Sequence, residues 1–342
     1  MQIDSDEFLK RLMISDASFL TANEKSLLQK NLDSPDTLAL MSITDICNVV
    51  GRSITKAKWN GSKTRSKAEL ALKLIERLGI KSEFWGSEKY PAMLLEMKDP
   101  PYAIFYRGNL ECLNLPCVSV VGTRRATNCA RSASFDFGKQ ACDDGKVVVS
   151  GLAFGVDIAS HRGALKGSLG KTCAVLPSGI DTIVPSSHTK TAVKIIEQGG
   201  VILSEYTPGT PAEAFRFVQR NRLIAALSPA TVVIQAPAGS GAMITASLAL
   251  DYNRYVFFHE VCFDSESQPL KKESERLLMQ KVESKLMKES VMRGKLMNCP
   301  ERFVEDGAPV IKNYGEYRDY LMSGFDAIHI KNDNGQQELF DE

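Results

Sequence analysis

The sequence lacks any long apolar run: no stretch approaches the roughly 20 consecutive apolar residues that a membrane-spanning helix needs. It opens on MQIDSDEFLK, which is acidic and mixed, unlike a secretory signal peptide. Its eight cysteines have no paired-ligand spacing, and the nearest pair, Cys112 and Cys117, lies in an apolar context typical of reduced thiols. We therefore expect a cytoplasmic protein with no membrane segment and no bound metal.

Net charge and nucleotide-binding motifs are also scarce. The formal net charge is only +1, so the chain is no polycation, and a polyanionic partner would have to meet positive charge gathered locally. No G-x-G-x-x-G follows an apolar run, and no lysine follows the glycines of APAGSGAMIT as in a Walker A loop. These absences argue against a dinucleotide or nucleoside triphosphate, and we expect no cofactor.

The length of 342 residues allows two or three domains. Residues 1–80 are expected to form a small all-helical domain, because DEFLKRLMI, TANEKSLLQKNL and AELALKLIERLGI carry apolar residues at helical spacing. Gly79 is a plausible stop for the last of these helices. Residues 81–116 are interpreted as a linker or edge segment, in which YAIFYRG can form an edge strand.

From residue 117 short Val/Ile-rich runs alternate with amphipathic segments. The runs are CVSVVG, KVVVSG, KTCAVL, GVILSEY, TVVIQA and RYVFFHE. They are nearly continuous in apolar residues, as in strands buried on both faces of a parallel sheet. The sequence therefore predicts an α/β protein whose mainly parallel, doubly wound sheet spans residues 117–330.

A charged insertion at about 265–297 interrupts this pattern. Residues 270–297 are expected to form one amphipathic helix that packs its Leu/Met stripe on the body of the protein, while a basic face for a partner or nucleic acid is the alternative. DGAPVIKNYGEYRDYL then resembles a last strand and helix. The polar tail, residues 331–342, is expected to be disordered.

Ligands of open α/β sheets bind beyond the carboxyl ends of the strands, so we expect the site residues in the loops that follow the strands. After the first strand, Gly122 permits a sharp turn and Thr123 offers a hydroxyl group. Arg124 and Arg125 place two guanidinium groups at the start of the next helix. A helix start attracts anions, and the guanidinium fork matches phosphate oxygens, so this loop is a candidate phosphate site.

The second loop lies in VVSGLAFGVDIASH, where Ser150 and Gly151 end the strand. Asp157 and His161 are spaced i and i+4 on the following helix, a spacing that suits a metal site or an acid–base pair. A metal would need a third ligand, and the other histidines lie in unrelated segments. We favour a structural role for Asp157 and His161 in support of the loop, whose backbone amides would bind the ligand.

Arginines surround an aromatic residue in the stretch PAEAFRFVQRNR, where Arg220, Asn221 and Arg222 follow Phe217. Such a composition is typical of surfaces that bind single-stranded nucleic acid, with charge for phosphates and a ring for a base. A salt-bridged helix start with Phe217 in the core fits the composition equally well.

The last loop, APAGSGAMITA, offers Gly239, Ser240 and Gly241 at a helix start, with Thr245 one turn on. Small residues leave the backbone accessible, and Ser240 can donate to a phosphate, so this loop is a second candidate anion cradle.

In these motifs, residues from about 90 to 260 resemble the DprA/Smf family of bacterial DNA-processing proteins. The shared pattern is GTR at 122–124, SGLAFGVDIASH at 150–161, FVQRNR at 217–222 and SGAMITA at 240–246, in the same order. The resemblance implies a Rossmann-like core that binds single-stranded DNA and acts as a homodimer. It also implies delivery of DNA to the RecA recombinase in natural transformation, without catalytic turnover.

The resemblance assigns roles to individual residues. Arg124 would bind phosphate together with the backbone of Gly122 and Thr123, and Phe217 and Arg220 would line the DNA path. Ser150, Gly151 and Ser240 would complete the pocket.

The chain also departs from the family pattern. FFHEVCFDSESQ and the charged insertion stand where the family has a Pro-Gly turn, and the residues after 325 are too few for the winged helix found in many relatives. The segment QQELF (336–340) resembles peptides that dock on the bacterial sliding clamp, which makes the clamp a candidate partner.

Two rival functions remain. A Rossmann-like nucleotide phosphoribohydrolase acting on nucleoside monophosphates would need a glutamate that PAGSGAMITA lacks. A recombination scaffold acting through residues 1–80 or 270–297 is the other.

Overall fold

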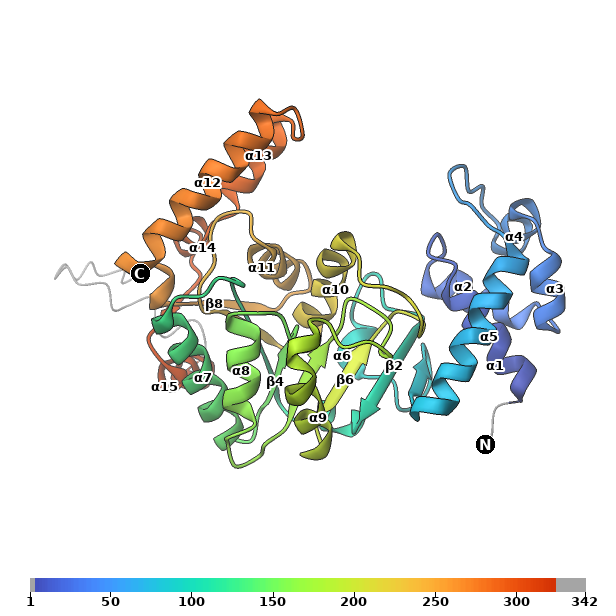
Figure 1. Ribbon diagram of the computed structural model, residues 1–342, viewed down its shortest axis with the longest axis horizontal. Helices are drawn as coiled ribbons and strands as arrows, with labels where there is room; N and C mark the ends of the chain where they lie inside the picture. Colours follow the sequence, from blue (N-terminus) through green and yellow to red (C-terminus); the bar gives the residue numbers. More distant parts are fainter. Residues whose placement is uncertain (1–3, 324–342) are drawn as a thin grey trace, which may run out of the picture.

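The computed structural model describes residues 4–323, which form a helical unit (residues 5–78) beside a nine-stranded sheet flanked by helices (Figure 1). The helices are α1 (Ser5–Ser15), α2 (Ala22–Lys30), α3 (Pro35–Leu40), α4 (Ile43–Val50), α5 (Gly61–Leu78), α6 (Ala92–Leu95), α7 (Asn128–Asp143), α8 (Val156–Ala164), α9 (Thr189–Glu197), α10 (Ala214–Ala226), α11 (Gly241–Asp251), α12 (Gln268–Glu283), α13 (Glu289–Met297), α14 (Pro300–Glu305) and α15 (Tyr314–Ser323). The strands are β1 (Lys81–Phe84), β2 (Ala103–Gly108), β3 (Cys117–Val121), β4 (Val147–Ser150), β5 (Thr172–Val175), β6 (Val201–Ser204), β7 (Ala230–Val233), β8 (Tyr255–His259) and β9 (Val310–Ile311).

The strands lie in the order β1-β2-β6-β5-β4-β3-β7-β8-β9. All pairings from β6 to β9 are parallel, whereas β1 and β2 pair antiparallel with each other and β2 pairs antiparallel with β6. The predicted α/β class and the doubly wound, mainly parallel sheet are confirmed. The apolar runs from residue 117 onward form β3 to β8, as their continuous burial in the sheet requires.

The strand order defines a switch point at β3. From β3 the chain builds β4, β5 and β6 toward one edge of the sheet, and it then returns to build β7, β8 and β9 on the other side of β3. The connections that leave β3 and β7 therefore diverge onto opposite faces of the sheet, and open α/β sheets bind ligands at the carboxyl ends of the strands next to such a point. This end of the sheet is where a ligand is expected.

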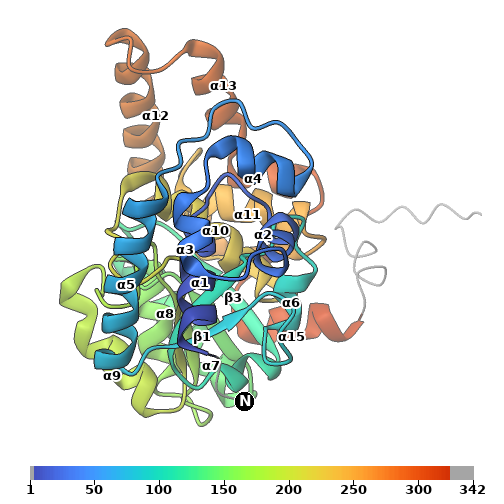
Figure 2. The ribbon, with the colours of Figure 1, turned by 90° about the vertical axis from the view of Figure 1, so that its right-hand side faces the viewer.

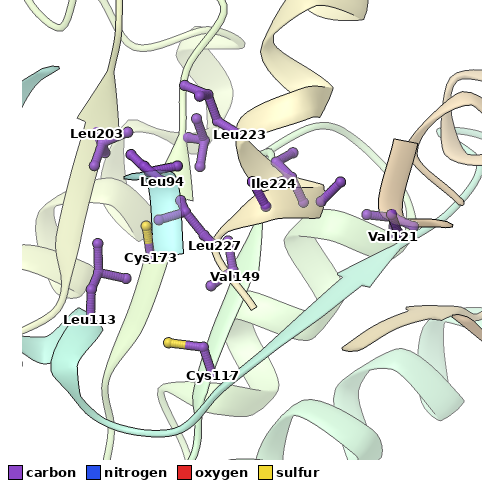
Figure 3. Close-up of a cluster of buried hydrophobic side chains, with 14 of the residues drawn as sticks. Leu94, Leu113, Cys117, Val121, Val149, Cys173, Leu203, Leu223, Ile224 and Leu227 are labelled. Atoms are coloured by element: carbon purple, nitrogen blue, oxygen red, sulfur yellow. The ribbon is translucent and has the colours of Figure 1, made fainter. Parts of the chain in front are cut away.

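Both faces of the sheet are covered by helices. On one face, α10 buries Leu223, Ile224 and Leu227 against strand residues such as Val149 and Leu203 (Figure 3). On the other face α7, α8 and α9 lie side by side in front of the strands (Figure 1), and Phe137 of α7 packs on aromatic residues of α15.

Helices α7 and α8 pack backbone against backbone. A Cβ added to Gly163 of α8 would lie 1.9 Å from the carbonyl oxygen of Phe135, and one added to Gly138 of α7 would lie 2.4 Å from that of Ser160. Only glycine permits such an approach. Because α7 follows β3 and α8 follows β4, this contact fixes the two loops that precede these helices.

The helical unit is built from local signals. Thr21 and Ser42 form capping boxes at the starts of α2 and α4, and Gly79 ends α5 in the left-handed conformation. The unit packs on the sheet edge through Phe8 against Phe84, with ring centroids 6.0 Å apart. The Tyr102 hydroxyl, which donates to Gln29 at 2.8 Å, adds a second link between the unit, which faces the viewer in Figure 2, and the sheet.

Two local expectations are corrected. YAIFYRG does not form an edge strand, because β2 pairs with β6 on one side and with β1, which the sequence analysis missed, on the other. The expected single helix over 270–297 is a hairpin of α12 and α13, since Lys285 turns the chain with φ of 58°. The apolar stripe of this hairpin is not packed on the body: only Leu278 is buried, and Leu286 is 80% exposed.

The tail, residues 331–342, lies outside the described residues, as does the clamp-like segment 336–340. Within residues 4–323 no helix combines the length and apolarity that crossing a membrane requires. The division of the chain into domains, with its boundary near residue 80, stays a prediction.

We predict that Gly163→Ala destabilises the protein by about 3 kcal/mol, because the new methyl group collides with the Phe135 carbonyl and forces α7 and α8 apart. Urea unfolding measures the change. Gly294→Ala in the exposed α13 is the matched control, since nothing lies within 4 Å of its added Cβ, and it should be neutral or stabilising by up to about 1 kcal/mol. Equal stability of both variants would contradict the close packing of α7 on α8.

Candidate nucleic-acid interface

The candidate site lies at the switch point of the sheet. It consists of the loops 122–127, 151–155 and 235–240, which follow β3, β4 and β7, together with the first two turns of α10; we call this surface the rim. Thr245 is buried within α11, and Arg222 is paired with Glu205 and Asp99 beyond the first two turns of α10; the other predicted site residues lie in the rim or border it.

The loop after β3 is held by Gln235. The Thr123 amide donates to the Gln235 carbonyl at 2.7 Å, and the Gln235 side-chain oxygen accepts from the Thr127 amide at 3.0 Å. A Cβ at Gly122 would lie 2.4 Å from Val156, so the loop can pass here only with glycine. The Thr123 hydroxyl accepts from the Arg125 amide at 3.2 Å. The Thr123 amide is thus engaged by Gln235 and the Arg125 amide by the Thr123 hydroxyl. The expectation that the Thr123 amide binds phosphate is therefore corrected.

Arg124 forms no ion pair within residues 4–323, and the ring of Phe217 orients its side chain. Its side chain is exposed, and its guanidinium carbon lies 4.6 Å from the ring centroid of Phe217 on α10. Phe217 is therefore a partly exposed partner of Arg124 and not a core residue, although Arg216 and Arg222 on the same helix form ion pairs as the alternative interpretation expected. The nucleic-acid surface stays a prediction. A guanidinium held flat on a ring keeps its N–H groups available at its edge for phosphate oxygens.

Arg220 is buried, at 3% exposed. Its Nη1 donates to the carbonyl oxygens of Gly151, at 2.8 Å, and of Val175. Burial lowers the pKa of Arg220 to about 10, and the Asp157 carboxylate opposes that shift. Arg220 therefore does not line a surface that a polynucleotide reaches, and that expectation is corrected; it joins α10 to the ends of β4 and β5.

Asp157 and His161 are both buried beneath the loop after β4. The Asp157 carboxylate accepts from the Ala153 amide at 3.4 Å. Burial raises the pKa of Asp157, while Arg220 and the backbone amides of Ala153 and Gly151 lower it. The loop amides that were expected to bind the ligand thus face Asp157.

His161 is neutral. Its Nδ1 lies 2.8 Å from the Thr172 hydroxyl, which already donates to the Val148 carbonyl, so Nδ1 is the donor in this pair. Burial lowers the pKa of His161 to about 3, and Arg220 adds to the effect. Within residues 4–323 no group of three or more His, Cys, Asp or Glu side chains is placed to hold a metal ion.

Other predicted residues hold the rim together. The buried Ser150 hydroxyl donates to the Val120 carbonyl at 2.6 Å, so it does not complete an open pocket. A Cβ at Gly151 would lie 2.5 Å from the Arg220 guanidinium. Asn221 donates to the Gly241 carbonyl at 3.1 Å, and Arg222 forms ion pairs with Glu205 and Asp99.

The loop after β7 contacts the end of the charged insertion. Ser240 caps α11 by accepting from the Met243 amide at 3.4 Å, and the Thr245 hydroxyl donates to the Gly241 carbonyl at 3.0 Å. The Gly239 amide donates to the Asn298 carbonyl at 2.8 Å, and a Cβ at Gly239 would lie 2.7 Å from Lys295. The end of the α12–α13 hairpin therefore covers one side of the expected anion cradle.

The segment 257–268, at the end of β8 and beyond it, contacts the rim through Ser267. Ser267 accepts from the Gln235 side-chain nitrogen at 2.5 Å and donates to the Val261 carbonyl at 2.6 Å. Gln235, which the sequence analysis missed, thus connects this segment to the loop that carries Arg124.

Beside the rim lies a hollow of about 850 Å³ between α7 and α8, which we call the arginine hollow. Arg124, Arg125, Arg131 and Arg162 line it, all exposed, and no carboxylate does. Within residues 4–323 none of these four guanidiniums forms an ion pair. Phe154, 51% exposed, adds an aromatic ring. The sequence analysis missed Arg131, Arg162 and Phe154. Arg131 could have been found, because it lies in the first turn of the helix that follows Arg125.

The fold and the site define an α/β protein with a doubly wound sheet that presents unpaired arginines and aromatic rings at its switch point. The family described as DNA recombination-mediator protein A matches residues 81–292. Protein Smf of Borreliella burgdorferi is 35% identical over 256 residues, which cover 75% of this chain and 80% of that protein. The chain belongs to the family of DNA recombination-mediator protein A, as the resemblance implied.

DNA processing protein A of Streptococcus pneumoniae agrees both in sequence and in structure. DNA processing protein DprA of Streptococcus pneumoniae is 39% identical over 170 residues, 49% of this chain and 58% of that protein. The X-ray structure of DNA processing protein A from Streptococcus pneumoniae covers 94% of this chain and 99% of its own, with a TM-score of 0.64 and 25% identity. The predicted Rossmann-like core is therefore confirmed. The matched sequence spans four fifths of the Borreliella protein but only 58% of the Streptococcus protein.

The buried His161 predicts a pH dependence of stability. The unfolded histidine takes up a proton near pH 6.5 and the folded one only near pH 3, so stability is unaffected above pH 7 and falls as the pH drops below 6.5. Between pH 7 and 5 the expected loss is about 2 kcal/mol. Burial also lowers the pKa of His259, so some loss remains in any variant of His161. Urea unfolding at both pH values should show a loss about 2 kcal/mol larger in the wild type than in His161→Gln, and an equal loss in both would contradict the assignment.

Proposed function

We propose that this chain binds single-stranded DNA at the rim and the arginine hollow, without catalytic turnover. The observation that carries the proposal is the set of four unpaired arginines beside Phe217 and Phe154. Guanidinium groups suit phosphates, and rings accept any base by stacking, so affinity should depend on salt and little on sequence. Membership of a family of DNA recombination mediators supports a nucleic-acid ligand.

We further propose the family-level role: the chain, as a homodimer in the cytoplasm, protects incoming single-stranded DNA and loads a RecA-type recombinase during natural transformation and recombination. The description of the family as a recombination mediator supports this role. The sliding clamp stays a candidate partner through residues 336–340.

The phosphoribohydrolase alternative has no observation in its favour. The loop after β7 and the first turns of α11 carry no carboxylate, and Ser240, the hydroxyl at that helix start, caps the helix. A carboxylate that stabilises an oxocarbenium-like centre is required for that chemistry.

Arg124→Ala should weaken binding of a labelled oligo(dT) about tenfold and lower the slope of log K against log salt by about 0.7, because one phosphate contact is lost. Fluorescence anisotropy over a salt series, with single- and double-stranded oligonucleotides, measures both quantities. Lys139→Ala is the control, because Lys139 lies on α7 outside the hollow and pairs with Asp143. Unchanged binding by Arg124→Ala would refute the rim as the DNA site.

The mediator role predicts a second result. On single-stranded DNA coated by single-strand-binding protein, the wild-type chain should shorten the lag of RecA-type filament assembly, and Arg124→Ala should not, because it no longer holds the strand. Filament assembly followed by ATP hydrolysis measures the lag. An equal lag with and without the wild-type chain would contradict the mediator role while leaving DNA binding intact.

A further inference from the structure

A groove of about 940 Å³ separates the helical unit from the start of α10. One wall comes from the α1–α2 connection and the start of α5, and the other from residues 98–103, 205–210 and the first turns of α10. In Figure 1 the helical unit lies to the right of α10. The groove shares the first turns of α10 with the rim, but none of the rim loops and no residue of the arginine hollow lines it, and none of the roles proposed above uses it.

The groove carries surplus positive charge. Its three carboxylates all face cations of the same groove: Asp16 pairs with Lys67 at 3.0 Å, and Asp99 and Glu205 share Arg222. The buried Lys25, which also lines the groove, adds a favourable charge interaction with Glu205. Three further lysines, Lys58, Lys63 and Lys98, line the groove, are exposed, and form no ion pair within residues 4–323. Such a surface attracts an anion with several charges, because nothing in the groove balances these ammonium groups.

Aromatic rings alternate with these lysines. Trp59 and Trp85, the only two tryptophans of the chain, both line the groove, as do Tyr206 and Phe215. Phe215 is 52% exposed, and Arg216 lies 5.5 Å from the Tyr206 ring centroid. Trp59 and Trp85 are half-buried, so each offers only part of its ring to the groove. Positive charge beside accessible rings is the arrangement that binds single strands, with phosphates on the cations and bases on the rings.

The groove continues from the rim around one helix. Phe217 of α10 supports Arg124 on the rim side, whereas Phe215 and Arg216 of the same turn face the groove. Between them the outer side of α10 exposes Val218, at 45%, next to Phe215. A strand leaving Arg124 therefore reaches the groove across one helical turn and meets exposed apolar surface on the way.

We propose that this groove binds the continuation of the single DNA strand held at the rim, with phosphates on Lys58, Lys63 and Lys98 and bases stacked on Trp59, Trp85 and Phe215. The proposal rests on the proposed function. It gives the helical unit a role in DNA binding: the unit supplies one wall of the second half of the path.

The two tryptophans report on the groove directly. Oligo(dT) long enough to cross from the rim into the groove, such as a 20-mer, should quench the tryptophan fluorescence of the full chain by stacking. A 6-mer should bind the rim, as seen by its anisotropy, with little quenching. Because neither tryptophan lies in the rim or the arginine hollow, binding there leaves their emission unchanged.

The test variant is Lys58→Ala/Lys63→Ala/Lys98→Ala, whose exposed side chains form no hydrogen bond or ion pair within residues 4–323. It should bind the 6-mer like the wild type and the 20-mer about 10- to 100-fold more weakly, lose the quenching, and lower the salt slope by about 2. The matched control is Lys30→Ala/Lys73→Ala/Lys81→Ala, three exposed lysines outside the groove that form no ion pair within residues 4–323.

The outcomes separate the two proposals. Normal binding of both oligonucleotides by the test variant, or 20-mer binding without quenching, overturns the groove and leaves the rim intact. Weaker binding of both oligonucleotides by Arg124→Ala, with tryptophan quenching that appears only at correspondingly higher 20-mer concentration, supports a strand that enters through the rim. A wild-type chain that binds neither oligonucleotide overturns the proposed function and the groove together. Tryptophan quenching that follows protein concentration without DNA assigns the groove to a second copy and overturns the proposal.

Discussion

The site depends on one buried cation. Arg220 lies inside the protein with its guanidinium on the carbonyl oxygens of Gly151 and Val175 and with the Asp157 carboxylate near it. A buried charge is tolerated only where such partners compensate for the lost water. Since the partners sit at the ends of β4 and β5, Arg220 fixes α10 against the sheet. Phe217, one turn earlier on the same helix face, is thereby held beneath Arg124.

This arrangement separates two kinds of arginine in one short segment of the fold. Arg220 donates to backbone carbonyl oxygens and Arg222 pairs with carboxylates, so both guanidinium groups stabilise the packing of α10. Arg124 and the other arginines of the hollow form no ion pair within residues 4–323, and their side chains are exposed to solvent. A nearly neutral chain thus concentrates positive potential at its switch point without being basic overall. The lysines of the groove extend the same principle to the helical unit.

The sequence predicted the sheet because strands buried on both faces leave continuous apolar runs, and it predicted the location of the site because parallel strands share one carboxyl edge. It could not separate Arg124 from Arg220, since both occur in similar polar motifs and only the packing of α10 buries one of them. Ser150 misled for the same reason: its hydroxyl lies at a strand end but points to the Val120 carbonyl. No local sequence pattern marks Gln235, because its partner Thr127 lies more than 100 residues away in the sequence. The hairpin was read as one helix because its apolar spacing continues through the turn at Lys285.

The central claim is that Arg124 and Phe217 touch the DNA strand itself. Photo-cross-linking tests it most directly, with a single-stranded oligonucleotide that carries 5-iodouracil at successive positions and with mass-spectrometric mapping of the linked peptides. The account predicts that at least one position links to the α10 peptide that contains Phe217, and that unlabelled single-stranded DNA competes for this link. Cross-links confined to surfaces away from the rim, at every position of the label, would contradict it.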